Sequence, residues 1–118
     1  MLHPQIVVFE PQSQIAPLLR ELAAAERWAL REPRLESNCR EQLRQITPTV
    51  FVVFLEETGE RELNLLADAS KLPYVAVVAV GSVDNAETLA GLAWDCGADF
   101  ALFPPLARHT GRGFYDLG

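Results

Sequence analysis

The chain has 118 residues, and sixteen acidic against ten basic side chains give it a net charge of −6 at pH 7. This length suits one domain, because each half would fall below the size at which a hydrophobic core folds well. An acidic chain repels phosphate backbones and anionic lipid, so neither nucleic acid nor a membrane surface is expected as a partner. The hydrophobic share of 49% and the charged share of 22% are those of a globular protein and exclude a wholly disordered one.

Cysteine content and the N-terminus point to a soluble cytoplasmic protein. The two cysteines, Cys39 and Cys96, are too few for a disulfide framework or a zinc site of four thiolates. The segment 1–5 has no basic region followed by a long apolar stretch, so no signal peptide is expected. The longest apolar runs are strand-sized, well below the roughly 20 residues that span a bilayer.

Short runs of β-branched and aromatic residues predict strands that are buried on both faces. These runs lie at residues 6–9, 50–55, 74–80 and 100–103, and a weaker run at 28–30 predicts an edge strand.

Between the predicted strands, apolar residues recur at helical spacing. Ser13 is the predicted N-cap of the first helix, and Pro17 falls in its first turn, where a missing N–H costs little. Asp84 or Asn85 is the predicted cap of the last helix, and Gly97 its stop. The predicted buried faces are Ile15, Leu18, Leu19 and Leu22; Cys39, Leu43 and Ile46; Leu63, Leu65, Leu66, Ala69 and Ser70; and Leu89, Leu92, Ala93 and Cys96.

Strands that alternate with helices predict an α/β fold of three layers, a doubly wound parallel sheet of five strands in the flavodoxin-like order 2-1-3-4-5. Residues 1–118 are expected to form one domain, with the regular fold over about 5–105. The tail 106–118 contains Gly111 and Gly113 and has no helical stripe, so the fifth helix is predicted to be atypical or missing.

A missing fifth helix would leave one face of the fifth strand poorly covered, and such a face usually marks an interaction site. A second copy of the chain could cover it, or Phe114, Tyr115 and Leu117 could fold back over it. The chain could also be an N-terminal part of a longer protein.

Over about residues 5–105 the sequence resembles the receiver domain of response regulators. Glu10 follows the first apolar strand, and Gly59 lies one turn beyond the third. The most specific part of the resemblance runs from Gly97-Ala98-Asp99, at the end of the fourth helix, to Pro105 after the next strand. The resemblance also implies a cis peptide bond between Pro104 and Pro105.

The resemblance implies where a phosphorylation site would lie. Receivers use two metal-binding acids, an aspartate nucleophile, a hydroxyl and a lysine. These positions fall on Glu10 and Pro11, on Phe54, on Val78 or Ser82 according to the end from which the loop is counted, and on Pro104. A phenylalanine ring can neither attack phosphorus nor ligate a hard metal, and proline carries no charge.

The chain is therefore expected to be a pseudo-receiver of two-component signal transduction, without enzymatic activity and without a cofactor. It would act through protein–protein contacts, with a protein partner or a second copy bound at the face of the fourth helix, the fifth strand and the C-terminal tail. Phe54 itself would fill the space of the lost acids as a core plug, or line a docking pocket.

Two other functions stay open. Glu10, Glu56 and Glu57 could bind a small ligand or a divalent metal, since carboxylates at neighbouring strand ends suit Mg²⁺ or Ca²⁺; a solvated acidic rim is the simpler interpretation. An enzyme of this fold is disfavoured, because the sequence has no nucleophile elbow, phosphate loop or Cys–His pairing. Cys96 is expected to be a buried, inert thiol.

Overall fold

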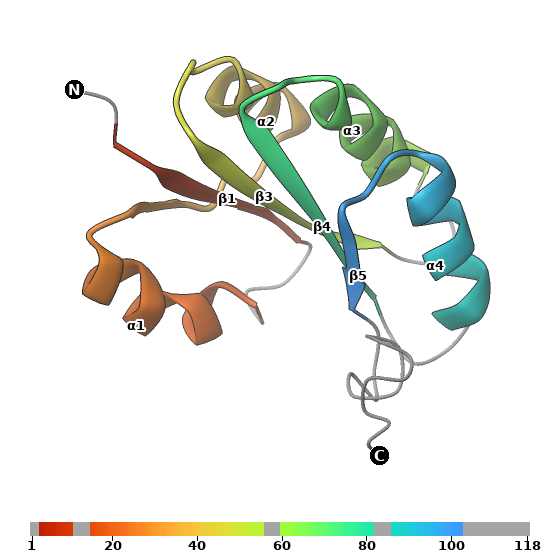
Figure 1. The fold of residues 1–118 in the computed structure, drawn as a ribbon, viewed down its shortest axis with the longest axis horizontal. Coiled ribbons are helices and arrows are strands. Elements are labelled where there is room, and N and C mark those ends of the chain that lie inside the picture. The colour runs from red at the N-terminus through yellow and green to blue at the C-terminus, as the bar shows by residue number, and fades with distance from the viewer. Residues whose placement is uncertain (1–2, 11–14, 56–59, 82–85, 103–118) are drawn as a thin grey trace.

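The computed structural model describes residues 3–10, 15–55, 60–81 and 86–102, in which strands and helices alternate throughout (Figure 1). The strands are β1 (Gln5–Phe9), β2 (Ala29–Arg31), β3 (Thr49–Leu55), β4 (Val75–Gly81) and β5 (Phe100–Leu102). The helices are α1 (Ala16–Glu26), α2 (Glu36–Leu43), α3 (Glu60–Ser70) and α4 (Ala86–Asp95).

The five strands form one parallel sheet in the order β2-β1-β3-β4-β5, with β2 at the edge next to β1. This confirms the predicted doubly wound fold, its strand order and its weak edge strand. Because all strands run the same way, their carboxyl ends meet at one edge of the sheet, which is where ligands bind in such folds.

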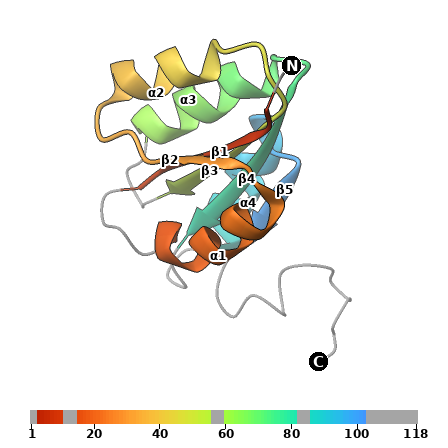
Figure 2. The same ribbon diagram turned by 90° about the vertical axis from the view of Figure 1, so that its left-hand side faces the viewer.

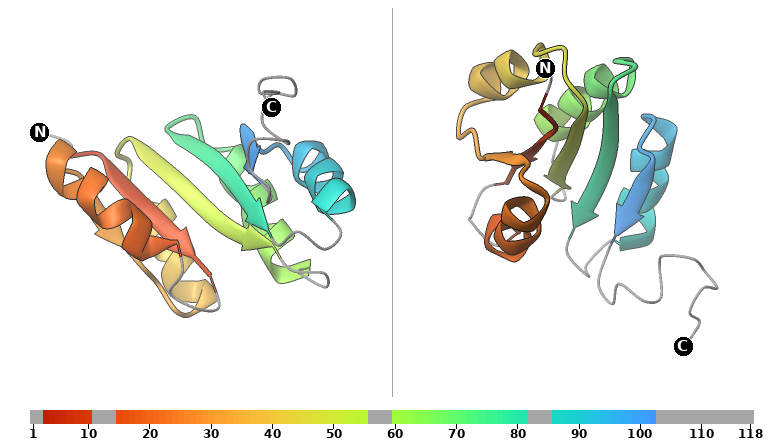
Figure 3. Two further views of the ribbon diagram at one scale, coloured as in Figure 1. Left: turned by 90° about the horizontal axis from the view of Figure 1, so that it is seen from below. Right: turned by 60° about the vertical axis from the view of Figure 1, so that its left-hand side comes forward.

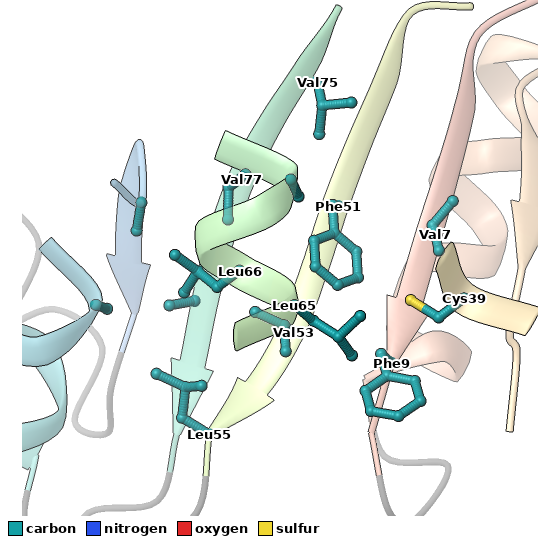
Figure 4. Packing of buried hydrophobic residues seen from close by; sticks show 14 of the residues in the cluster. Val7, Phe9, Cys39, Phe51, Val53, Leu55, Leu65, Leu66, Val75 and Val77 are labelled. Atoms are coloured by element: carbon teal, nitrogen blue, oxygen red, sulfur yellow. The ribbon is translucent and has the colours of Figure 1, made fainter. Parts of the chain in front are cut away.

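The larger hydrophobic cluster lies between the sheet and the helices α2, α3 and α4 (Figure 4). Phe51, Leu65 and Leu66 have no exposed surface there. Full burial of side chains of this size stabilises a fold by roughly 1.5–3 kcal/mol each. This side of the sheet therefore carries most of the hydrophobic stabilisation among the described residues.

The opposite face of the sheet holds a smaller cluster beneath α1, as Figure 2 shows with α1 on one side and α2 and α3 on the other. Its buried members are Ile6, Val8, Ala23 and Val52.

The predicted buried stripe of the first helix was wrong in half of its residues. Leu18 is 77% exposed and Leu22 is 50% exposed, whereas Ala16 and Ala23 are buried. The physical reason is that this helix has two adjoining apolar flanks, and the flank with Ile15, Leu19 and Ala23 faces the sheet. Leu18 and Leu22, on the other flank, are left in solvent.

Three more expectations of burial need correction. Leu92 on α4 is 41% exposed, and Ile46, which lies beyond the end of α2, is 72% exposed. Cys96 is half-buried instead of buried, because it follows the last residue of α4. Cys96 still packs against the larger cluster, whereas Ile46 shows that a helical stripe extrapolated past the end of its helix no longer predicts burial.

Gly97 ends α4 as predicted. Its φ is +103°, a conformation that glycine adopts without strain, and Ala98 donates a hydrogen bond back to the carbonyl of Ala93 at 2.9 Å. A Cβ at this position would lie 2.6 Å from Oγ of Ser70. The predicted caps Ser13, Asp84 and Asn85, the Pro104–Pro105 bond and the tail lie outside the described residues.

Replacement of Gly97 by alanine is expected to lower the free energy of unfolding by about 2–4 kcal/mol, from a strained backbone together with a steric overlap. The matched control is Gly91→Ala, inside α4, where a Cβ meets nothing within 4 Å. That control should leave stability unchanged or raise it by up to about 1 kcal/mol. Urea unfolding measures both, and equal effects of the two variants would contradict the assignment.

Candidate functional site at the carboxyl edge of the sheet

The carboxyl ends of β1, β3 and β4 bring the predicted site positions to one edge. Phe9 pairs with Val53, so the residues that follow them, Glu10 and Phe54, lie next to each other in register. Phe54 itself pairs with Val80 of β4. The first acid and the nucleophile position of the receiver pattern are thus brought together.

Glu10 is a buried carboxylate, only 6% exposed, that binds the start of α1. The backbone N–H of Ile15 donates to both of its oxygens, at 3.0 Å to Oε1 and 3.1 Å to Oε2. The N–H of Ala16 donates to Oε2 at 3.1 Å. The carboxylate thereby satisfies N–H groups that have no partner within the helix, and its charge opposes the positive end of the helix dipole.

The sequence could not show this role of Glu10. The residue at the N-cap, Ile15, makes no side-chain capping bond, so the cap comes from five residues upstream, where the chain leaves β1. Capping is usually sought in the residue directly before the helix. The surviving acid of the receiver pattern is thus engaged as a structural group.

Phe54 lies at the rim of the sheet and not in its core. It is half-buried and belongs to neither hydrophobic cluster. The reason is its place as the last residue but one of β3, on the face that it shares with Val52, where no described helix lies over the end of the strand. The side chain places an apolar ring at this edge of the sheet, next to Glu10 in register.

On the other face of the same edge, an arginine contacts an aromatic ring and an acid. The guanidinium carbon of Arg61 lies 5.4 Å from the centre of the Phe9 ring, a cation–π distance. Its Nη2 donates to Oε2 of Glu62 at 3.0 Å. This group was not predicted from the sequence, because nothing in the acidic run 56–62 marks Glu62 as buried.

The remaining predicted positions are spread or lie outside the described residues. Val78 sits in the middle of β4, paired with Val52, and the strand continues to Gly81. Pro11, Glu56, Glu57, Ser82 and Pro104 are not described. Among the described residues no group of three or more histidine, cysteine or acidic side chains could hold a metal ion.

The Gly-Ala-Asp sequence after α4 has a structural role. The N–H of Val77 donates to Oδ2 of Asp99 at 2.7 Å, and the N–H of Asp99 donates to the carbonyl of Val77 at 2.8 Å. Together with the turn at Gly97 these bonds hold the start of β5 against β4.

Of the two cysteines, Cys39 is buried and Cys96 is half-buried. Cys39 has no exposed surface and packs in the larger cluster beside Phe9 and Leu65 (Figure 4). Burial raises the pKa of the Cys39 thiol from 9.0 to about 12, against a smaller lowering by Arg40. A thiol with such a pKa is not a nucleophile at neutral pH.

Solved structures with similar folds are receiver domains in the main. The receiver domain of an HD domain-containing protein from Pseudomonas fluorescens Pf-5 matches with a TM-score of 0.71 and 18% identity, over 90% of this chain and 79% of that one. The receiver domain of the TMAO respiratory system response regulator TorR matches with a TM-score of 0.69 and 18% identity, over 88% and 85%.

A third similar structure is a putative pilus assembly protein, CpaE, from Burkholderia thailandensis E264. Its TM-score is 0.63 at 18% identity, over 98% of this chain and 96% of that one. No protein-family model and no curated protein sequence matches the chain. The chain therefore has the fold of a receiver domain, which confirms the predicted resemblance at the level of the fold.

The role of Glu10 predicts a loss of stability on its removal. Glu10→Ala should lower the free energy of unfolding by about 1–3 kcal/mol, because buried N–H groups lose a charged acceptor, and Glu10→Gln by less, because one oxygen acceptor remains. The control is Glu21→Gln, at an exposed position of α1. Urea unfolding measures all three, and wild-type stability for Glu10→Ala would refute the capping role.

The raised pKa of Cys39 predicts a dependence of stability on pH. The Cys39 thiol ionises in the unfolded chain near 9.0 but in the folded chain only near 12. Its contribution to the free energy of unfolding is therefore complete below pH 9. It is lost as the pH rises from about 9 to 12, by about 1.4 kcal/mol per pH unit. Urea unfolding at several pH values should show this loss in wild type and in Cys96→Ala, but less of it in Cys39→Ala. Equal slopes in all three would contradict the assignment.

Proposed function

We propose that the chain is a non-enzymatic regulatory module that acts through protein–protein contacts and uses a receiver fold without phosphoryl transfer. The single observation that carries this proposal is the engagement of Glu10. In receivers an acid at this position holds a metal ion, whereas here both carboxylate oxygens accept hydrogen bonds from the start of α1. A metal would have to compete with those N–H groups for the same oxygens.

The apolar character of the edge supports the same proposal. Phe54 stands at the register position next to Glu10, and its neighbour across β4 is Val80. Neither side chain can accept a phosphoryl group or coordinate a hard cation. Arg61, a described cation near this edge, is engaged by Phe9 and Glu62 on the other face of the sheet.

The role in signalling is supported by the neighbours in fold, two of which are receiver domains, one of them from a response regulator. The helix α4 offers two exposed apolar side chains to a protein partner, Leu92 (41% exposed) and Trp94 (52% exposed), on either side of the buried Ala93. Exposed tryptophan is enriched at binding hot spots. Within the described ranges no helix is both long and apolar enough to cross a membrane.

The proposal predicts that the protein takes up no phosphoryl group. Incubation with acetyl phosphate and Mg²⁺ should leave the intact mass unchanged, and beryllofluoride with Mg²⁺ should leave the melting temperature unchanged. Phe54→Asp should behave in the same way, because Glu10, the described acid beside this position, is already engaged by the N–H groups of Ile15 and Ala16. A phosphorylatable receiver serves as the positive control, and an adduct on the wild-type chain would overturn the proposal.

A further inference from the structure

One face of the sheet is open over β3, β4 and β5 in the part of the chain that the structure describes. The burial of β4 alternates without exception: Val75, Val77 and Ala79 face the helices α3 and α4 and are buried, whereas Ala76, Val78 and Val80 face the other way and are half-buried. In the left panel of Figure 3, α1 lies in front of the sheet at its β1 side, and no described helix lies in front of β4.

The open face extends onto both neighbours of β4. Ala101 is buried in the larger cluster, so Phe100 and Leu102 point to the opposite side, where Phe100 is 60% exposed. Val50 on β3 is half-buried on this same side. We define the open face by six side chains that are all apolar: Val50, Ala76, Val78, Val80, Phe100 and Leu102.

At the amino ends of the strands the structure has a hollow of about 390 Å³. Val50 and Ala76 of the open face line it together with Trp28, Tyr74 and the prolines 4, 48 and 73, and it reaches round the end of the sheet to Gln5, Thr49 and Val75. An apolar surface with such a hollow suits the side chains of an apolar helix.

The helix α1 carries apolar side chains that this molecule leaves uncovered. Leu18 is 77% exposed and Leu22, one turn later, is 50% exposed, and Ala25 continues the same stripe one turn further. The charged side chains that flank this stripe are those of Glu21 and Glu26, whereas Arg20 lies on the opposite side of the helix and Arg27 follows its end.

We propose that a second copy of this chain covers the open face, with Leu18 and Leu22 of each copy packed on the open face of the other. Such an exchange is self-complementary and closes in a two-fold symmetric dimer. It places self-association on α1 and the sheet and leaves Trp94 on α4 for another partner. This inference names a partner for the regulatory module proposed above and rests on that proposal.

The C-terminal residues 103–118 are the other candidate for this place. Their sequence contains the adjacent prolines 104 and 105 and glycines at 111, 113 and 118. This composition does not suit an amphipathic helix of three turns, because proline and interior glycine both disfavour helix. A helix supplied by a second copy fits the open face better.

Sedimentation velocity of the full chain, at protein concentrations from about 10 to about 300 µM, tests the proposal. The expected result is a concentration-dependent species of about twice the 13.1 kDa chain mass. Leu18→Glu and Phe100→Glu should each raise the dissociation constant at least tenfold, because each substitution buries a carboxylate twice in the dimer. Both positions are exposed in the single chain, so the variants should fold.

The matched controls are Leu35→Glu and Ile46→Glu, at exposed apolar residues around α2 that are 61% and 72% exposed. These variants should dimerise like wild type. A wild-type chain that stays monomeric throughout, or controls that weaken the dimer as much as Leu18→Glu, would overturn the proposal. A monomer whose unfolding free energy falls in Phe100→Glu would point to the C-terminal tail instead. None of these results bears on phosphoryl uptake, so the two proposals fail separately.

Discussion

The position of α1 depends on one interaction, the binding of the Glu10 carboxylate to the first N–H groups of that helix. A buried carboxylate is costly unless hydrogen bonds compensate for the water it loses, and three short contacts with Ile15 and Ala16 supply that compensation. The bond joins the end of β1 to the start of the only described helix on its side of the sheet. It holds the start of α1 at the end of β1 and engages both oxygens of the carboxylate.

The architecture could be predicted well from the sequence, because parallel strands buried on both faces appear as continuous apolar runs. All five strands, their order and the stop at Gly97 follow from apolar runs and one glycine. The N-terminal boundaries of strands were missed where polar residues are buried. Gln5 begins β1 and is only 4% exposed, because its amide donates to the Gln42 carbonyl and to Thr49 Oγ1. Partners so far away along the chain leave no local pattern.

Side-chain orientation was harder to predict than fold. Helical spacing identified Leu18 and Leu22 as core residues, yet both are exposed, because the helix has apolar side chains around more than half of its circumference. The candidate site shows the same limit. The register of β1 and β3 brings Glu10 beside Phe54, but the role of Glu10 depends on backbone N–H groups, which every sequence contains. The buried Glu62 with its partner Arg61 left no signal at all.

The alternation along β4 has a consequence for how the chain tolerates variation. Its seven residues lie in two environments: Val75, Val77, Ala79 and Gly81 are buried, whereas Ala76, Val78 and Val80 are half-buried. In a library of random variants sorted only for solubility of the single chain, polar replacements should vanish from the buried positions and accumulate at the others. Ala76, unlike Val78 and Val80, packs against neither cluster, so a scarcity of polar residues at Ala76 in natural sequences would record selection for association.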